Sequence, residues 1–190
     1  MSKSTTPKQS KPRQKQIKLS HIQKQHKQIN KMETYVLDEE QNLIIKYYPI
    51  FPENKIEELL KELHEAILYC ESENLDFFKS DDQLYKYLYL LITRKMTSLE
   101  SEIPKDFPSQ ISILSQMIDI GLIRTLFDSV LDGNEVTEVF ARVDEMITNL
   151  VKIAEATQKE MAKLERLENK EILSTPFNVL STPSSTDVFQ

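Results

Sequence analysis

The spacing of apolar side chains changes several times along this chain of 190 residues, and each change predicts a different element. Two short runs rich in β-branched and aromatic residues, 34–37 and 43–48, flank a polar connector. This pattern is typical of a β-hairpin, which must pack against a helix because two strands alone are only marginally stable in water. Prolines at positions 49 and 52 then end the regular structure.

A helical period replaces the strand pattern from Glu53 and predicts an amphipathic helix of about 18 residues. A second helix is expected from Ser80, and a third follows a loop over residues 99–108, with Ser109 as its cap. Gly121 is expected to end the third helix before a short fourth one. The apolar stripe of the first of these helices consists of Ile56, Leu59, Leu60, Leu63, Ile67 and Cys70.

The last predicted helix is the longest, with Asn134 as its cap and no glycine or proline before about Leu173. Its apolar positions alternate in steps of four and three, which is a heptad pattern. A straight helix of that length spans about 55 Å, more than a domain of this size can cover. We therefore expect a partner helix, or self-association, along a stripe made of Val143, Ile147, Leu150, Ala154, Thr157, Met161 and Leu164. The alternative is an exposed helix held by charged pairs.

These patterns together predict a mainly α fold. It is a small helical bundle with an N-terminal β-hairpin and a long C-terminal helix, flanked by disordered termini. The expected divisions are a basic arm over 1–32, a helical domain over 33–133, the long helix over 134–173, and a Ser/Thr/Pro-rich tail over 174–190. Composition supports helices, because 39% of residues are apolar and the chain has only two glycines.

Charge divides the chain near residue 32. The first 31 residues carry nine lysines and arginines and no acidic residue, whereas the rest carries 15 basic and 30 acidic residues. Such an arm suits weak, sequence-tolerant binding to nucleic-acid phosphates, but it equally suits an acidic partner, the chain's own acidic body, or a purely solubilising role. The residues expected to make these contacts are Lys11, Arg13, Lys15, Lys18, Lys24 and Lys27.

The arm also has a helical option. Ile22, His26 and Ile29 recur at helical spacing, so residues 14–31 are expected to fold when a partner neutralises the lysines, the alternative being a solvated coil. The arm contains one arginine and no aromatic residue, which disfavours base reading and base stacking.

No residue pattern identifies a catalytic or metal site. His64 and the glutamate after it lack the second histidine of a zinc-protease helix, since Leu68 occupies that position. Cys70 lies on an apolar stripe and is expected to be a small core residue rather than a nucleophile. Neither glycine belongs to a phosphate-binding loop. We therefore predict a protein that is not an enzyme and has no cofactor.

Three segments, in this order, resemble small helical proteins of tailed bacteriophages. They are Tyr-Tyr-Pro-Ile-Phe-Pro at 47–52, Leu-Asp-Phe-Phe-Lys-Ser-Asp-Asp-Gln-Leu at 75–84, and Ile-Asp-Ile-Gly-Leu at 118–122. The resemblance covers about residues 34–165 and points to tail assembly chaperones or minor tail and virion proteins. It implies a non-enzymatic protein that shields apolar segments of another morphogenetic protein, such as a tape measure.

The expected location is the host cytoplasm or the virion. The N-terminal residues lack the apolar stretch of a secretory signal, and no run of apolar residues is long enough to cross a membrane. A single cysteine excludes an intramolecular disulfide.

Overall fold

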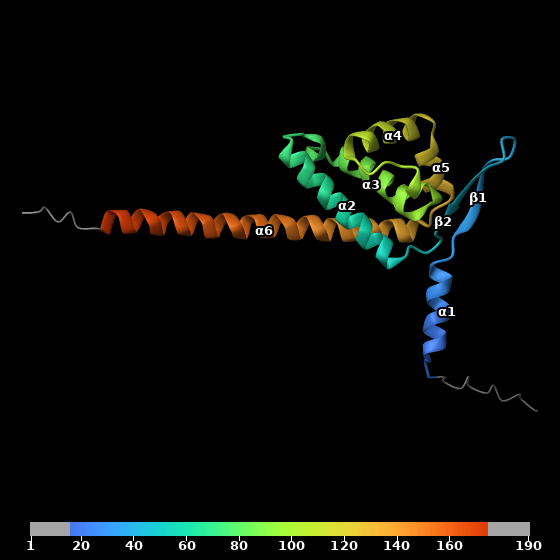
Figure 1. The fold of residues 1–190 in the computed structure, drawn as a ribbon, viewed down its shortest axis with the longest axis horizontal. Coiled ribbons are helices and arrows are strands. Elements are labelled where there is room, and N and C mark those ends of the chain that lie inside the picture. The colour runs from blue at the N-terminus through green and yellow to red at the C-terminus, as the bar shows by residue number, and fades with distance from the viewer. Residues whose placement is uncertain (1–15, 175–190) are drawn as a thin grey trace, which may run out of the picture. The chain divides into compact units, whose positions relative to one another are not determined.

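A computed structural model describes residues 16–174, with side chains as far as residue 163 (Figure 1). The mainly helical fold, the hairpin and the long last helix are confirmed. The chain divides into two compact units, residues 1–141 and 142–190. The elements are α1 (Leu19–Ile29), β1 (Glu33–Asp38), β2 (Leu43–Tyr47), α2 (Glu53–Ser72), the 3₁₀ turn η1 (Phe77–Lys79), α3 (Asp81–Met96), the 3₁₀ turn η2 (Ser98–Ser101), α4 (Phe107–Asp119), α5 (Leu122–Ser129) and α6 (Gly133–Ser174).

The core of the first unit forms around α3. The second half of this helix is buried on all sides, so that even Arg94 and Lys95 have almost no exposed surface. α2 packs along α3 through its predicted stripe, and Cys70 is confirmed as a core residue with 2% of its surface exposed. Burial raises the pKa of the Cys70 thiol, which keeps it protonated and unreactive at neutral pH.

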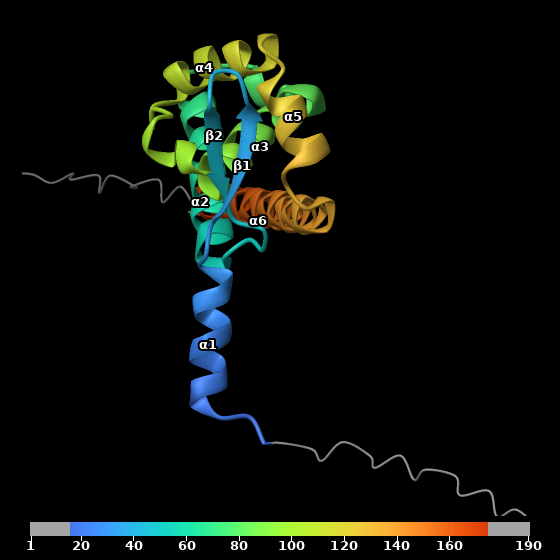
Figure 2. The ribbon, with the colours of Figure 1, turned by 90° about the vertical axis from the view of Figure 1, so that its right-hand side faces the viewer.

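The hairpin packs against α5, as two strands alone require (Figure 2). Its strands are antiparallel, with Tyr35 opposite Ile45, and an irregularity after Val36 shifts the register toward the turn. Ile45 is buried against Leu126 and Val130, the latter at the end of α5. Backbone contacts between the end of β2 and the end of α3 tie the hairpin to the bundle, because the amide of residue 48 donates to the carbonyl of residue 96 over 2.9 Å.

The predicted cap of α4 is wrong. Asp106, rather than Ser109, caps α4, because its carboxylate accepts a hydrogen bond of 3.0 Å from the Ser109 amide. Pro108 therefore lies in the first turn of α4, where its missing N–H group costs nothing. Ser80 is the N-cap of α3, where that helix was expected to begin, but its side chain makes no capping hydrogen bond. Gly121 separates α4 from α5 as predicted, with a φ of 72° that favours glycine.

The long helix α6 begins at Gly133, one residue before its predicted start. The carboxylate of Asp132, rather than the Asn134 side chain, satisfies the first turn by accepting a bond of 2.7 Å from the Asn134 amide. Phe140 packs its ring against Tyr85 and Tyr89 of α3, at centroid distances of 5.6 and 5.7 Å.

Across the described residues, no helix is both long enough and apolar enough to cross a membrane.

Candidate functional site

The predicted apolar stripe of the long helix α6 becomes more exposed from residue 143 to residue 163. Val143 is buried, and Ile147 and Leu150 are half-buried. From residue 151 to residue 163 every side chain is exposed, including the predicted stripe positions Ala154, Thr157 and Met161. Leu164, the last predicted position, lies outside the residues whose side chains are described.

Two further apolar residues widen this exposed stripe. Val151 and Ile153 flank the predicted heptad positions and leave 53% and 62% of their surfaces exposed, while Met161 leaves 59%. The hydroxyl of Thr157 donates to the Ile153 carbonyl over 2.9 Å, so its methyl group is left for packing. We call the residues Val151, Ile153, Ala154, Thr157 and Met161 the α6 stripe. Heptad spacing identified three of them but not Val151 and Ile153, which lie at its edges.

The other side of the same helix segment is charged. Lys152, Glu155, Lys159, Glu160 and Lys163 lie away from the α6 stripe, and all are exposed. Lys163 donates to Glu160 over 2.6 Å, one turn earlier in the helix. The segment is therefore amphipathic, with a charged side suited to solvent and an apolar side with no cover within the described part of the chain.

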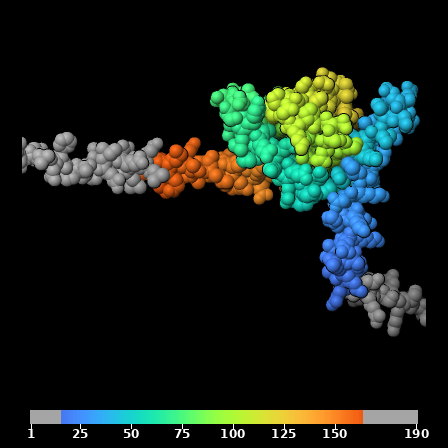
Figure 3. Space-filling model, in the orientation of Figure 1, coloured from blue at the N-terminus to red at the C-terminus, as the bar shows by residue number. Residues whose placement is uncertain are grey.

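The basic helix α1 is a second exposed surface (Figure 3). It contains no buried residue and no acidic residue, and Lys18, Lys24 and Lys27 are all exposed in and beside it. This corrects the predicted disorder over part of the arm, because residues 19–29 take the helical alternative. Lys11, Arg13 and Lys15 lie outside the described residues.

Local hydrogen bonds explain the ends of α1. The His21 ring accepts a bond of 3.1 Å from the Lys18 amide at the start of the helix. At the other end, the Asn30 side chain donates to the His26 carbonyl over 2.9 Å. These contacts satisfy backbone groups at both ends of an 11-residue helix that contains no buried residue.

A buried polar network joins α2, α3 and α4 at Glu62. The Glu62 carboxylate accepts hydrogen bonds from the guanidinium of Arg94 and from the Gln110 amide, the latter over 2.7 Å, and it pairs with Lys95 at 3.3 Å. The Tyr87 hydroxyl donates to the Gln110 side-chain oxygen over 2.5 Å. Burial and the charge of Glu62 raise the pKa of Tyr87, so this hydroxyl stays protonated.

The network continues at its exposed edge. Lys95 pairs with Glu58 at 3.3 Å, and Lys55 pairs with Glu100 at 2.8 Å. Partial burial opposes the charged form of Glu58, but its hydrogen bond to Lys95 and the charge of Lys55 outweigh it and lower its pKa. Partial burial likewise opposes the charged form of Lys55, but Glu100 outweighs it and raises the lysine's pKa. Each charge in this group has a partner, which favours a structural role.

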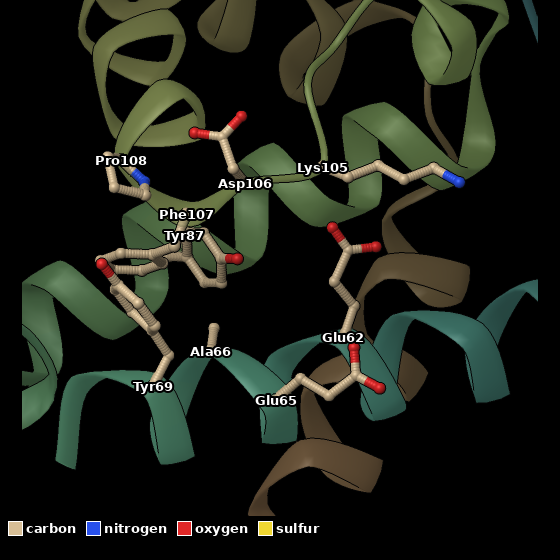
Figure 4. A pocket seen from close by; sticks show the side chains of 9 residues that line it. All are labelled: Glu62, Glu65, Ala66, Tyr69, Tyr87, Lys105, Asp106, Phe107 and Pro108. Atoms are coloured by element: carbon tan, nitrogen blue, oxygen red, sulfur yellow. The ribbon is translucent and has the colours of Figure 1, made fainter. Parts of the chain in front are cut away.

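A shallow cavity of about 440 Å³ lies beside this network (Figure 4). The rings of Tyr69, Tyr87 and Phe107 gather on one side of it, and the carboxylates of Glu62 and Glu65 lie on the other. Glu62 is already bound to Arg94, and Glu65 pairs with an exposed lysine at 3.7 Å. Lys105 and Asp106 also line the cavity, and the Asp106 carboxylate caps α4, so the cavity combines an aromatic wall with charged groups that mostly have partners.

Sequence reasoning missed the buried network. Arg94 and Lys95 were available as a signal, because two basic residues stand among apolar residues, between Ile92 and Met96. A charged residue at such a place needs a buried partner. The sequence does not show which of the many glutamates supplies it, because Glu62 lies 32 residues away.

Comparison with known proteins gives one family. A family model described as YomO matches residues 19–175, which include every helix and strand described above as far as α6. Comparisons with curated proteins and with solved structures give no match. YomO is a phage-type family, which agrees with the phage origin that the sequence suggested. Since the match covers most of the chain, the protein belongs to the YomO family.

Proposed function

We propose that this protein is a non-enzymatic interaction component of a phage, acting as a tail assembly chaperone or a minor virion protein. Membership of a phage-type family supports the phage context. The α6 stripe is the observation that carries the interaction role, because it leaves a continuous apolar surface on a helix that is otherwise charged. The proposed partner is an apolar helix of another morphogenetic protein.

The energetics favour a covered stripe. Burying a side chain the size of valine, isoleucine or methionine contributes about 1.5 to 3 kcal/mol. Val151, Ile153 and Met161 each leave more than half of their surface exposed. Covering all three supplies about 2 to 5 kcal/mol, allowing for their present partial burial, which helps to offset the entropy lost on association.

The geometry favours a helical partner. The centre of the α6 stripe, Ala154, Thr157 and Met161, follows heptad steps, so one helix can lie along it with its side chains between those of α6. The neighbouring glutamates and lysines lie on the solvent side, where they keep the free helix from aggregating. A protein that holds an apolar helix of a second protein in this way prevents that helix from associating prematurely, which is the task of an assembly chaperone.

Two alanines of α6 provide a matched test. Ala154 lies in the α6 stripe, whereas Ala156 lies about 160° around the helix on the charged side, and both are exposed. We expect Ala154→Glu to abolish co-purification of the phage morphogenetic partner from phage-producing cells, whereas Ala156→Glu retains it. Both variants should keep the wild-type circular dichroism spectrum, because both add the same side chain to an exposed helical position.

Two results would contradict the proposed function. If the wild-type protein is strictly monomeric by light scattering and co-purifies with no phage protein, it has no interaction role. If both alanine variants keep the partner, or both lose it, the α6 stripe is not the binding surface.

A further inference from the structure

We propose that α1 binds the phosphate backbone of duplex nucleic acid without reading its sequence. This role is separate from protein binding through α6, since it uses a different helix. The starting observation is that α1 is helical and contains no buried residue, although 11-residue helices are marginal on their own. Such a helix gains stability when its charges meet a polyanion.

The charge of α1 matches that partner. Lys24 and Lys27 lie one turn apart on the same side of the helix, and Lys18 lies at its start. No acidic side chain precedes Glu33, so nothing in this part of the chain neutralises the lysines. Duplex DNA carries a negative charge about every 1.7 Å along its axis, so a row of lysines finds phosphates at any register.

The residue types specify the mode of binding. Lysine acts as a point charge toward phosphate, whereas arginine makes the paired hydrogen bonds that recognise guanine. Within residues 16–31 there is no arginine and no phenylalanine, tyrosine or tryptophan, which disfavours both base reading and base stacking. The remaining polar residues of α1 are mostly glutamine and histidine, which donate hydrogen bonds to phosphate oxygens.

The acidic charge of the rest of the chain confines this contact to α1. Residues 32–190 carry 15 basic and 30 acidic side chains, so the body repels a polyanion. This charge asymmetry also sets the orientation of the protein on the duplex, because the acidic body must point away from the nucleic acid that α1 binds.

An anionic membrane is the competing partner, because α1 also has an apolar side. Leu19 and Ile22 of α1 are exposed, Ile22 by 50% of its surface, and Ile17 is exposed just before the helix. A membrane would require this apolar side to be buried, whereas a duplex requires only the lysines. Lys24 and Lys27 lie about 140° or more around the helix from Ile22, so the two sides can be changed separately.

The test uses the full chain, a fluorescent duplex DNA, and a salt titration followed by anisotropy. For the wild type we expect binding at low salt that is equal for two unrelated duplex sequences and weakens steeply as salt rises. In the variant Lys24→Gln/Lys27→Gln, the slope of log affinity against log salt should become less negative by about 2, because two phosphate contacts are lost. The matched control, Lys152→Gln/Lys159→Gln, removes two exposed lysines from α6 and should leave the slope unchanged.

Two further measurements separate the duplex from the membrane. Ile22→Gln should leave DNA affinity within twofold of the wild type, and the wild type should not sediment with vesicles of anionic phospholipid. The proposal is overturned by absence of DNA binding at low salt, by equal slope changes in the two lysine variants, or by vesicle binding that Ile22→Gln abolishes. None of these results depends on the α6 stripe, so the proposed function is tested separately.

Discussion

At the scale of single residues, the most informative side chain is Arg94. It is 2% exposed and binds Glu62, whose side chain is itself 16% exposed. A buried ion pair adds little net stability compared with an apolar pair of the same size, but removal of one partner leaves an uncompensated charge. Substitution of either Arg94 or Glu62 alone is therefore expected to destabilise the protein, although the pair itself does not make the fold unusually stable.

Replacement of Arg94 by methionine tests this account. We expect Arg94→Met to lower the free energy of unfolding by about 3 kcal/mol, because Glu62 loses its main partner in a buried environment. Arg124→Met is the matched control, since Arg124 pairs with Asp128 at 3.4 Å but both side chains are largely exposed. The control should change stability by less than about 1 kcal/mol. Urea unfolding measures both, and equal losses would refute the importance of burial.

At the scale of elements, apolar periodicity predicted the helices and the hairpin well. The stripe of α2 was found because burial on one side of a helix leaves a repeat of 3.6 residues in the sequence. The start of α4 was misplaced, because Ser109 and Asp106 are both good caps and only the structure shows which carboxylate or hydroxyl meets a free amide. Local chemistry of this kind is ambiguous when two capping residues lie close together.

The candidate sites were predicted less evenly. Heptad spacing gave the centre of the α6 stripe, since it depends on residues close in sequence. It gave neither Val151 nor Ile153, because a strict heptad excludes flanking positions. The network at Glu62 joins three helices through contacts distant in sequence, and no local pattern records such contacts.

The two glycines provide a prediction about helix junctions. Gly121 has a φ of 72°, whereas Gly133 begins α6 without a positive φ, and at both positions an added Cβ atom would have open space. We expect Gly121→Ala to destabilise the protein by about 1 kcal/mol, because alanine is strained in the left-handed region. Gly133→Ala should be neutral or stabilising by up to about 1 kcal/mol. Thermal unfolding compares them, and equal effects would show that φ is not the cause.

At the scale of the whole molecule, titrating groups limit stability at both ends of the pH range. The unfolded chain protonates Glu58 near its ordinary pKa of 4.5, whereas the folded protein keeps the carboxylate charged to lower pH. The stability from Glu58 is thus present above pH 4.5 and is lost as the pH falls through the folded pKa. Burial of Tyr87 raises its pKa from 10.0, so its contribution is present below pH 10 and is lost as the pH rises further.

We therefore expect a plateau of stability between about pH 5 and pH 10, measured by urea unfolding at a series of pH values. Glu58→Gln should reduce the slope on the acid side only, and Tyr87→Phe should reduce it on the alkaline side only. An acid slope that is identical in the wild type and in Glu58→Gln would show that other carboxylates are responsible, such as Asp106, whose pKa is lowered by its bonds to Ser109.

The position of Glu62 also has a consequence for the cooperativity of unfolding. The Glu62 carboxylate on α2 accepts hydrogen bonds from Arg94 of α3 and from Gln110 of α4. If any of these helices detaches alone, it leaves a charge or an amide buried without a partner, and that partial state is costly. The three helices are therefore expected to open together, so that their slowest backbone amides exchange with solvent as a single group.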